Sequence, residues 1–327
     1  MAQIILKNIT KTFKVAERPE GRFSIFKGAF TRKTKLIDAI DNISFSINQG
    51  ELVGYIGPNG AGKSTSVKVM SGILTPESGE CVIMGRTPWK ERVAHVSQIG
   101  VVFGQRSQLW WDVPVNDSFD LLKDIYDIPA PEYKKRLDKL VETMDVGALL
   151  KTPVRQLSLG QRMRCEVVAA LLHSPKILFL DEPTIGLDAV SKLALREFLE
   201  NENKQNGVTM ILTTHDMDDI EALCERVMVI GHGKLLFDGI LNDLKRKFSP
   251  LRKINAKMSS PVENILIDGA AKTEISGNNF TVWFDPEKIP AHKIVADIAE
   301  RLPLVDITIQ ERDIDEMIAA MYQEMNL

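Results

Sequence analysis

The 327-residue chain contains only three cysteines, Cys81, Cys165 and Cys224, which are widely separated and odd in number. This pattern is typical of reduced thiols in the cytoplasm and excludes a disulfide framework as the basis of the fold. Long apolar runs are also missing, because nowhere do about 18 apolar residues follow one another without a charge. The strand-like start, Gln3–Asn8, predicts no secretory signal. Any role at a membrane therefore requires another chain.

The chain has no excess of charge of one sign: 41 Lys and Arg stand against 44 Asp and Glu, a formal net charge of -3. No global basic field favours nucleic acid as a partner. No heptad run predicts a coiled coil. One basic stretch, residues 14–37, is either a solvated insertion between strands, which we prefer, or a patch that docks on anionic lipid or a partner. Metal-ligand spacing is absent around His95, His173, His232 and His292.

A glycine-rich loop lies between a predicted strand and a predicted helix. Gly57–Ser64 fits the pattern G-x-x-x-x-G-K-S and follows the apolar run Glu51–Ile56. Glycines let backbone N–H groups turn toward phosphate oxygens, and the next helix points its positive end at them. Lys63 supplies a point charge between the β- and γ-phosphates, and the Ser64 hydroxyl ligates Mg²⁺. The predicted nucleotide-binding residues of the loop are Gly57, Pro58, Asn59, Gly60, Ala61, Gly62, Lys63, Ser64 and Thr65.

Two acidic residues end a second apolar strand. Asp181 and Glu182 follow Ile177–Leu180, at the carboxyl end where ligands gather in parallel sheets. We expect Asp181 to hold Mg²⁺, directly or through water. Glu182 is predicted to accept the proton of an attacking water as a general base. Together with the phosphate loop, this pair predicts a P-loop NTPase.

Strands alternate with helical segments along most of the chain, which predicts a largely parallel sheet covered by helices on both faces. Residues 115–150 read as helical, Val208–Thr213 reads as a buried strand and Val227–Ile230 as a short strand. Residues 246–327 are predicted to form a separate small α+β domain. Its expected strands and helices are Arg252–Met258, Thr273–Ile275, Phe280–Phe284, Val305–Ile309, Ala291–Arg301 and Ile314–Met325.

Further segments resemble the motifs of ATP-binding cassette (ABC) ATPases, in the same order and at similar spacing. The segments are Leu157–Gln161 for the signature LSGGQ, Ile185–Asp188 for the D-loop, Gln105 for the Q-loop glutamine and His215 for the switch histidine. The resemblance covers residues 1 to about 245. It implies an α/β cassette with a parallel-sheet core, an antiparallel β subdomain and a helical subdomain at about 106–172.

Two positions depart from the family pattern. Leu159 replaces the first glycine of the signature pair, and Gly104 is inserted before Gln105. Because Ser158 and Gly160 are kept, we expect the signature to function. The stretch Val102–Trp111 resembles one branch of ABC-2-type exporter ATPases, which implies export. Trp110 and Trp111 either form a docking surface for a permease helix or pack inside the helical subdomain.

The resemblance implies roles for the matched residues. Two cassettes meet head to tail, and each ATP lies between the phosphate loop of one and the signature of the other. Gln105 would contact Mg²⁺ and the attacking water, and His215 would contact the γ-phosphate. Phe13, at the position of the A-loop aromatic, would stack on adenine or else belong to the core. The residues implied to meet the nucleotide or the neighbouring subunit are Ser158, Gly160, Gln161 and Asp188.

Three functions fit such a chain. The preferred one is the ATP-hydrolysing subunit of an ABC transporter, in which MgATP-driven dimerisation and hydrolysis act on a separately encoded membrane permease, here an exporter. A soluble ABC-family ATPase acting on nucleic acid or ribosomes fits less well, because there is one cassette and little net charge. A regulatory ATP switch is disfavoured because both Glu182 and His215 are present. The preferred function implies a homodimer on the cytoplasmic face of the membrane, held there by the permease.

Overall fold

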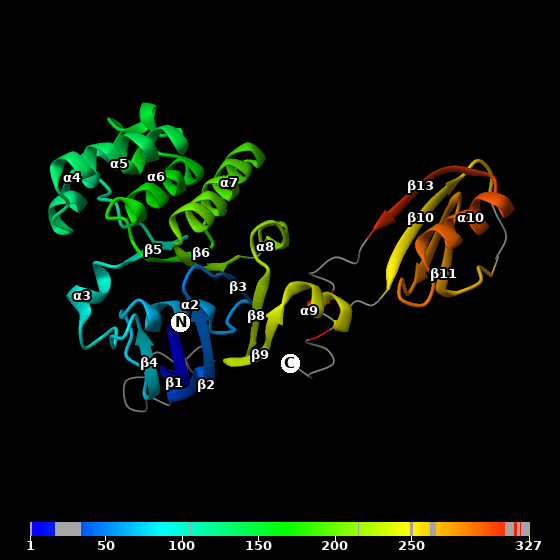
Figure 1. Cartoon of the computed structure of the whole chain (residues 1–327), viewed down its shortest axis with the longest axis horizontal. Helices are drawn as coiled ribbons and strands as arrows, with labels where there is room; N and C mark the ends of the chain where they lie inside the picture. Colours follow the sequence, from blue (N-terminus) through cyan, green and yellow to red (C-terminus); the bar gives the residue numbers. More distant parts are fainter. Residues whose placement is uncertain are drawn as a thin grey trace, which may run out of the picture. The chain divides into compact units, whose positions relative to one another are not determined.

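The computed structural model describes residues 2–16, 34–104, 106–214, 216–248, 251–261, 266–310, 317, 318 and 321. Gln105, His215, most of the basic stretch and most of the expected helix Ile314–Met325 lie outside these ranges. The chain divides into two compact units, Met1–Gly239 and Ile240–Leu327. Figure 1 labels most of the elements of both. No helix in the described ranges is long and apolar enough to cross a bilayer.

A six-stranded sheet with the order β5-β6-β7-β3-β8-β9 forms the centre of the first unit. Its strands are β3 (Leu52–Ile56), β5 (Ile99–Phe103), β6 (Ile177–Asp181), β7 (Thr209–Thr213), β8 (Arg226–Gly231) and β9 (Lys234–Ile240). The pairs β5–β6, β6–β7, β3–β7 and β3–β8 are all parallel. Every residue of β7 is buried, as expected of a strand covered on both faces. The predicted parallel core is confirmed.

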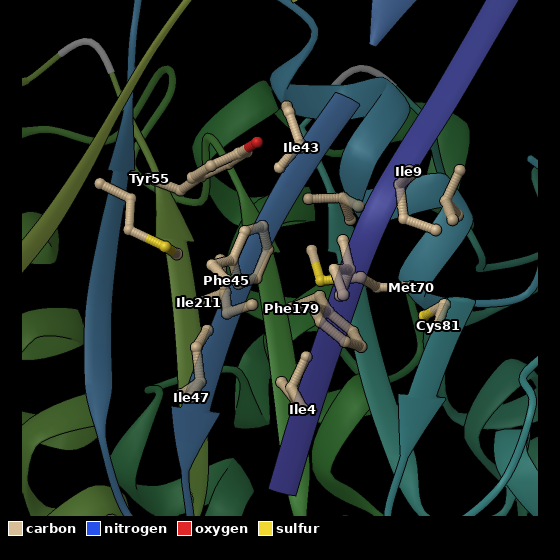
Figure 2. Packing of buried hydrophobic residues seen from close by; sticks show 14 of the residues in the cluster. Ile4, Ile9, Ile43, Phe45, Ile47, Tyr55, Met70, Cys81, Phe179 and Ile211 are labelled. Carbon is tan, nitrogen blue, oxygen red and sulfur yellow. The ribbon is translucent and has the colours of Figure 1, made fainter. Parts of the chain in front are cut away.

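A three-stranded antiparallel sheet, β2-β1-β4, packs next to this core. Its strands are β1 (Ala2–Ala16), β2 (Thr34–Asn48) and β4 (Ser78–Ile83). One buried cluster joins Ile4 and Phe45 of this sheet to Phe179 and Ile211 of the parallel sheet and to Met70 (Figure 2). Met70 ends helix α2 (Lys63–Met70). Burial of each large apolar side chain stabilises the fold by about 1.5–3 kcal/mol, so the phosphate-loop helix is fixed between two sheets.

The first unit contains further helices, of which α4 and α5 lie in the region 115–150 that was predicted to be helical, and α4, α5 and α6 form one group (Figure 1). They are α3 (Arg92–Val96), α4 (Val115–Ile125), α5 (Ala130–Thr143), η1 (Gly147–Leu149), η2 (Val154–Gln156), α6 (Leu159–Leu171), α7 (Ala189–Asn206) and α8 (Met217–Leu223). Between α4 and α5, Asp127 has a left-handed backbone and Pro129 is the N-cap residue of α5. Proline fixes this break because it has no N–H to continue a helix.

The second unit begins with α9 (Leu241–Phe248) and contains an antiparallel sheet of order β11-β12-β10-β13. Its other elements are β10 (Arg252–Met258), β11 (Ala270–Ser276), β12 (Asn279–Phe284), α10 (Ala291–Arg301) and β13 (Leu304–Gln310). Ile254, Phe280 and Phe284 of the sheet share a buried cluster with Ile294 and Ile298 of α10. The α+β character expected of this region is confirmed.

The three cysteines are free thiols and all are buried. Burial raises the pKa of the Cys81 and Cys165 thiols to about 12 and raises that of Cys224 further. Thiols of this kind pack as small apolar groups and react poorly, because the thiolate is the reactive form.

Candidate active site

The phosphate loop lies between β3 and α2, where two of its glycines have no room for a side chain. A Cβ on Gly57 would lie 2.3 Å from the carbonyl oxygen of Ile230. Gly62 has a φ of 108°, and a Cβ there would lie 2.2 Å from the carbonyl oxygen of Ala39. The loop is therefore pressed against β8 and β2 at positions that glycine alone can occupy. This contact aims the first turn of α2 at the loop, the arrangement that binds phosphate.

Lys63 is the first residue of α2 and is only 6% exposed. Its Nζ donates to the carbonyl oxygens of Gly57, at 2.5 Å, and Pro58, at 3.0 Å. Burial lowers the pKa of this ammonium group, and the charges of Glu182 and Asp181 oppose that shift. The Lys63 ammonium group is thus held at the loop, where the charges of Asp181 and Glu182 act on it.

The acidic pair is fixed by the neighbouring strand β7. Thr213 Oγ1 donates to Asp181 Oδ1 at 2.5 Å, and the Glu182 backbone N–H donates to the Thr213 carbonyl at 2.8 Å. Glu182 has a φ of 57°, a left-handed conformation that is uncommon outside glycine. These bonds restrict the positions of the Asp181 and Glu182 carboxylates.

A cavity of about 270 Å³ brings the loop and the acidic pair together. Its lining residues are Asn59, Ser64, Lys68, Phe103, Gly104, Arg106, Asp181 and Glu182. A second cavity of about 150 Å³ adjoins it at the loop and is lined by Ala39, Glu182 and residues 58–65. Five residues of the two cavities were not predicted as site residues from the sequence: Ala39, Lys68, Phe103, Gly104 and Arg106. Arg106 could have been predicted, because it directly follows Gln105, the expected Q-loop glutamine.

The donors in the larger cavity suit a magnesium–nucleotide complex. Ser64 provides a hydroxyl and Asp181 a carboxylate, and Mg²⁺ prefers oxygen ligands completed by water and phosphate. Among the described residues, no group of three His, Cys, Asp or Glu side chains could hold a metal without such help. The chain thus fits Mg²⁺ that arrives with phosphate oxygens.

A buried aspartate, which the sequence analysis also missed, ties the segment after Glu182 to the segment around position 215. Asp219 is fully buried; it accepts from Thr184 Oγ1 at 2.7 Å and Thr214 Oγ1 at 3.3 Å, and forms an ion pair with Arg196 at 2.5 Å. In the sequence Asp219 stands close to Asp216, Asp218 and Glu221, and no motif distinguishes it from them. His215 itself lies outside the described residues, but both segments next to it are fixed.

The signature residues lie at the start of α6. Ser158 accepts from the Gln161 N–H at 3.2 Å and Gln161 Oε1 accepts from the Ser158 N–H at 2.9 Å, a capping box that fixes the first turn. Leu159, the unusual residue of the motif, lies against Gly186 of the D-loop, where a Cβ would be 2.5 Å from Leu159 Cδ2. Signature and D-loop therefore contact each other within one chain.

Not every predicted residue reaches the cavities of this chain. Ser158, Gly160, Gln161 and Asp188 line neither of them. Asp188 instead caps α7 by accepting from the Ser191 N–H at 2.8 Å, and this bond is the main cause that lowers the pKa of its carboxyl. A role of the signature residues at the nucleotide of another subunit stays a prediction.

Phe13 lies in β1, opposite Ile37 of β2, and is 37% exposed. The Lys11 Nζ lies 5.7 Å from the centroid of its ring. Phe13 lines neither cavity, although Ala39 of the adjacent strand lines the smaller one. Its stacking on adenine stays a prediction.

Comparison with known proteins identifies the family. A family model described as "ABC transporter" matches residues 40–185. The linearmycin resistance ATP-binding protein LnrL of Bacillus subtilis is 30% identical over 301 residues, which cover 89% of this chain and 94% of LnrL. The methionine import ATP-binding protein MetN of Geobacillus kaustophilus is 33% identical over 222 residues, 66% of this chain and 65% of MetN.

The solved structures agree. A dimeric post-hydrolysis state of the ATP-binding cassette MJ0796 bound to ADP and Pi superposes with a TM-score of 0.62 at 26% identity. The match covers 73% of this chain and 98% of that one. In this family the cassettes dimerise and pair with membrane permease subunits. The chain belongs to the ABC transporter family as an ATP-binding subunit, an ATPase that hydrolyses ATP for transport.

Proposed function

We propose that this subunit drives an exporter. The observation that carries the proposal is the extent of similarity to LnrL, which spans 301 residues, against 222 for MetN. The first compact unit ends at Gly239, so a match of 301 residues must also include much of the second unit. The name of LnrL attributes resistance to it, and resistance to a compound fits its removal from the cell.

The chemistry of hydrolysis follows from the cavity residues. Backbone N–H groups of the loop and the Lys63 ammonium bind the phosphates, while Ser64 and Asp181 would hold Mg²⁺. When bound, Mg²⁺ neutralises charge on the phosphate oxygens. Glu182 accepts a proton from the water whose oxygen attacks the γ-phosphorus, and the bond to the leaving ADP oxygen breaks. By the family resemblance, Gln105 would contact Mg²⁺ and the attacking water, and His215 would contact the γ-phosphate; both lie outside the described residues.

The active unit in this proposal is a homodimer of cassettes. The first turn of α6 faces the nucleotide of the second subunit, where Ser158 and Gly160 complete the γ-phosphate cage and the helix adds its positive end. Asp188 fits the two subunits together at the D-loop. The absence of the signature residues from the cavities of their own chain supports this assignment.

The permease contacts the surface next to position 105 and holds the cassette at the cytoplasmic face of the membrane. Trp110 is 40% exposed and Trp111 is 51% exposed, and the Arg162 guanidinium lies 5.7 Å from the Trp111 ring centroid. Exposed aromatic pairs of this kind are typical anchors of protein interfaces.

The test is purification of the protein from gently solubilised membranes of its own cells, followed by transport in inverted vesicles. We expect a polytopic membrane protein at comparable abundance, and ATP-dependent accumulation of its substrate inside the vesicles, which corresponds to export. Vesicles with Lys63→Ala are the control. Movement out of the vesicles would contradict export alone, whereas recovery of ribosomal or DNA-bound proteins without a permease would contradict the transporter assignment.

A further inference from the structure

Helix α6 carries a buried carboxylate that the hydrolytic reaction does not use. Glu166 is 2% exposed and lies about two turns beyond Ser158. It accepts a hydrogen bond from Ser107 Oγ and another from the Gln108 N–H, at 3.1 Å. The Gln108 side chain donates in turn to the Glu166 carbonyl at 3.0 Å. Burial raises the pKa of Glu166, and these bonds and the charge of Arg162 oppose the shift.

These bonds connect two parts of the molecule with different tasks. Ser107 and Gln108 directly follow Arg106, which lines the larger cavity together with Gly104. Ser107 Oγ also accepts from the Leu109 N–H at 3.1 Å, so the short segment is internally tied as well. At the other end, α6 begins with the signature. Hydrogen bonds to Glu166 thus join the segment that follows the cavity-lining Arg106 to the helix that begins with the signature.

We propose that Glu166 is a positioning residue. In each subunit it couples the nucleotide cavity to the signature end of α6, and that end faces the second nucleotide of the dimer. The inference rests on the proposed homodimer, in which one subunit serves two nucleotides through these two regions. Hydrogen bonds to an ionised group in a buried setting are the stronger kind, and replacing them with apolar contact removes the link. Coupling of this kind appears as cooperativity between the two sites.

Glu202 of α7 offers a matched control. It is also 2% exposed, and it pairs with Arg136 at 3.0 Å and Lys139 at 3.6 Å. It therefore fixes α7 to α5 through a buried carboxylate, but it touches neither the segment after Arg106 nor the signature. Loss of either carboxylate should destabilise the fold, and only loss of Glu166 should change communication between sites.

The experiment measures ATP hydrolysis against ATP concentration, nucleotide binding and thermal unfolding for the full chain and for Glu166→Gln, Glu166→Leu and Glu202→Leu. We expect a wild-type Hill coefficient above 1, with about 2 as the limit set by two sites. Glu166→Leu should lower it to about 1 and slow maximal turnover about tenfold, with ATP affinity of the monomer within about twofold. Glu166→Gln should retain most of the cooperativity, because its amide oxygen still accepts from the Gln108 N–H.

Glu202→Leu should lower the melting temperature as much as Glu166→Leu and leave the Hill coefficient unchanged. A wild-type coefficient of 1, or equal coefficients in wild type and Glu166→Leu, would overturn the coupling role. The homodimer itself is tested separately by Ser158→Arg. If Ser158→Arg blocks ATP-dependent dimerisation while Glu166→Leu leaves cooperativity intact, the proposed function stands and this inference fails.

Discussion

Glu182 has a backbone conformation that is costly for a residue other than glycine. Its backbone is left-handed, which costs a non-glycine residue about 1–2 kcal/mol. It also meets Gly104 so closely that a Cβ there would lie 3.2 Å from Glu182 Cβ. Strain of this kind persists where the surrounding structure enforces it, here through the bond from the Glu182 N–H to Thr213. The conformation turns the carboxylate toward the cavity.

Replacement of Glu182 by Gln is expected to keep ATP binding and to abolish turnover. The amide has nearly the same shape but cannot accept the proton, and positioned general bases contribute about 10²–10⁴-fold to the rate. Equilibrium binding of a fluorescent ATP analogue and single-turnover hydrolysis check this. Lys63→Ala is the contrasting variant, since it should lose tight binding. Near-normal hydrolysis by Glu182→Gln would show that another group is the base.

His173 is expected to make stability depend on pH. Its Nε2 lies 2.8 Å from the Ile99 carbonyl and its ring stacks on Tyr126 with centroids 3.9 Å apart. Burial lowers its pKa from 6.5 to about 4. The unfolded state therefore binds the proton first as pH falls through 6.5, so stability is full above 6.5 and is lost toward pH 4. The loss between pH 7 and 5 should be about 2 kcal/mol.

Urea unfolding of the wild type and of His173→Gln at both pH values measures this. The glutamine keeps a donor for the Ile99 carbonyl and does not titrate, so the variant should lose less stability between the two pH values. His95, whose pKa is also lowered by burial, contributes equally to both proteins. The same pH dependence in the two proteins would refute the role of His173.

At the scale of elements, the contact between the signature and the D-loop explains why Leu159 is tolerated. Gly186 has a φ of 73° and no Cβ, and the Leu159 side chain fills that space. The substitution that departs from the family motif is thus matched by a glycine 27 positions later. In this chain, α6 and the segment leading into α7 pack as one surface.

Gly186→Ala is expected to destabilise the protein by about 1–3 kcal/mol, through steric overlap with Leu159 and backbone strain. Adding Leu159→Ala to Gly186→Ala should restore about 1 kcal/mol of the free energy of unfolding, because it removes the steric overlap but not the backbone strain. A double-mutant cycle measured by urea unfolding checks this. Gly207→Ala is the control, because Gly207 has a φ of 65° and nothing within 4 Å of its Cβ position, and so reports strain alone. An additive cycle would contradict the contact.

Elements with a local signal were predictable from the sequence, and contacts between distant elements were not. The phosphate loop, β6 and α10 each have their pattern within about a dozen residues, and they form as predicted. The entry of Arg106 into the cavity depends on a bridge between Phe103 and Arg106 and on how closely Gly104 packs on Asp181. The link from Glu166 to Ser107 spans 59 positions, and no periodicity reports such a pairing.

At the scale of the whole molecule, the composite site predicts that Ser158→Arg binds ATP as a monomer but does not dimerise. The arginine side chain would fill the space required by the second nucleotide, and the dimer dissociation constant should rise at least about a hundredfold in a Glu182→Gln background. Analytical ultracentrifugation with MgATP measures it. Ser158→Ala is the control, since it loses the helix cap at a cost of about 1 kcal/mol without adding bulk. Unchanged dimerisation of Ser158→Arg would refute the composite site.

The burial of all three thiols makes this protein convenient for optical measurements. Cys81, Cys165 and Cys224 should not react with maleimide dyes while the chain is folded, so they do not need to be replaced. A cysteine introduced at Val190, which is 77% exposed and two residues from Asp188, would then carry the label by itself. Energy transfer between donor- and acceptor-labelled copies would follow each closing and opening of the cassettes in real time, in the otherwise native chain.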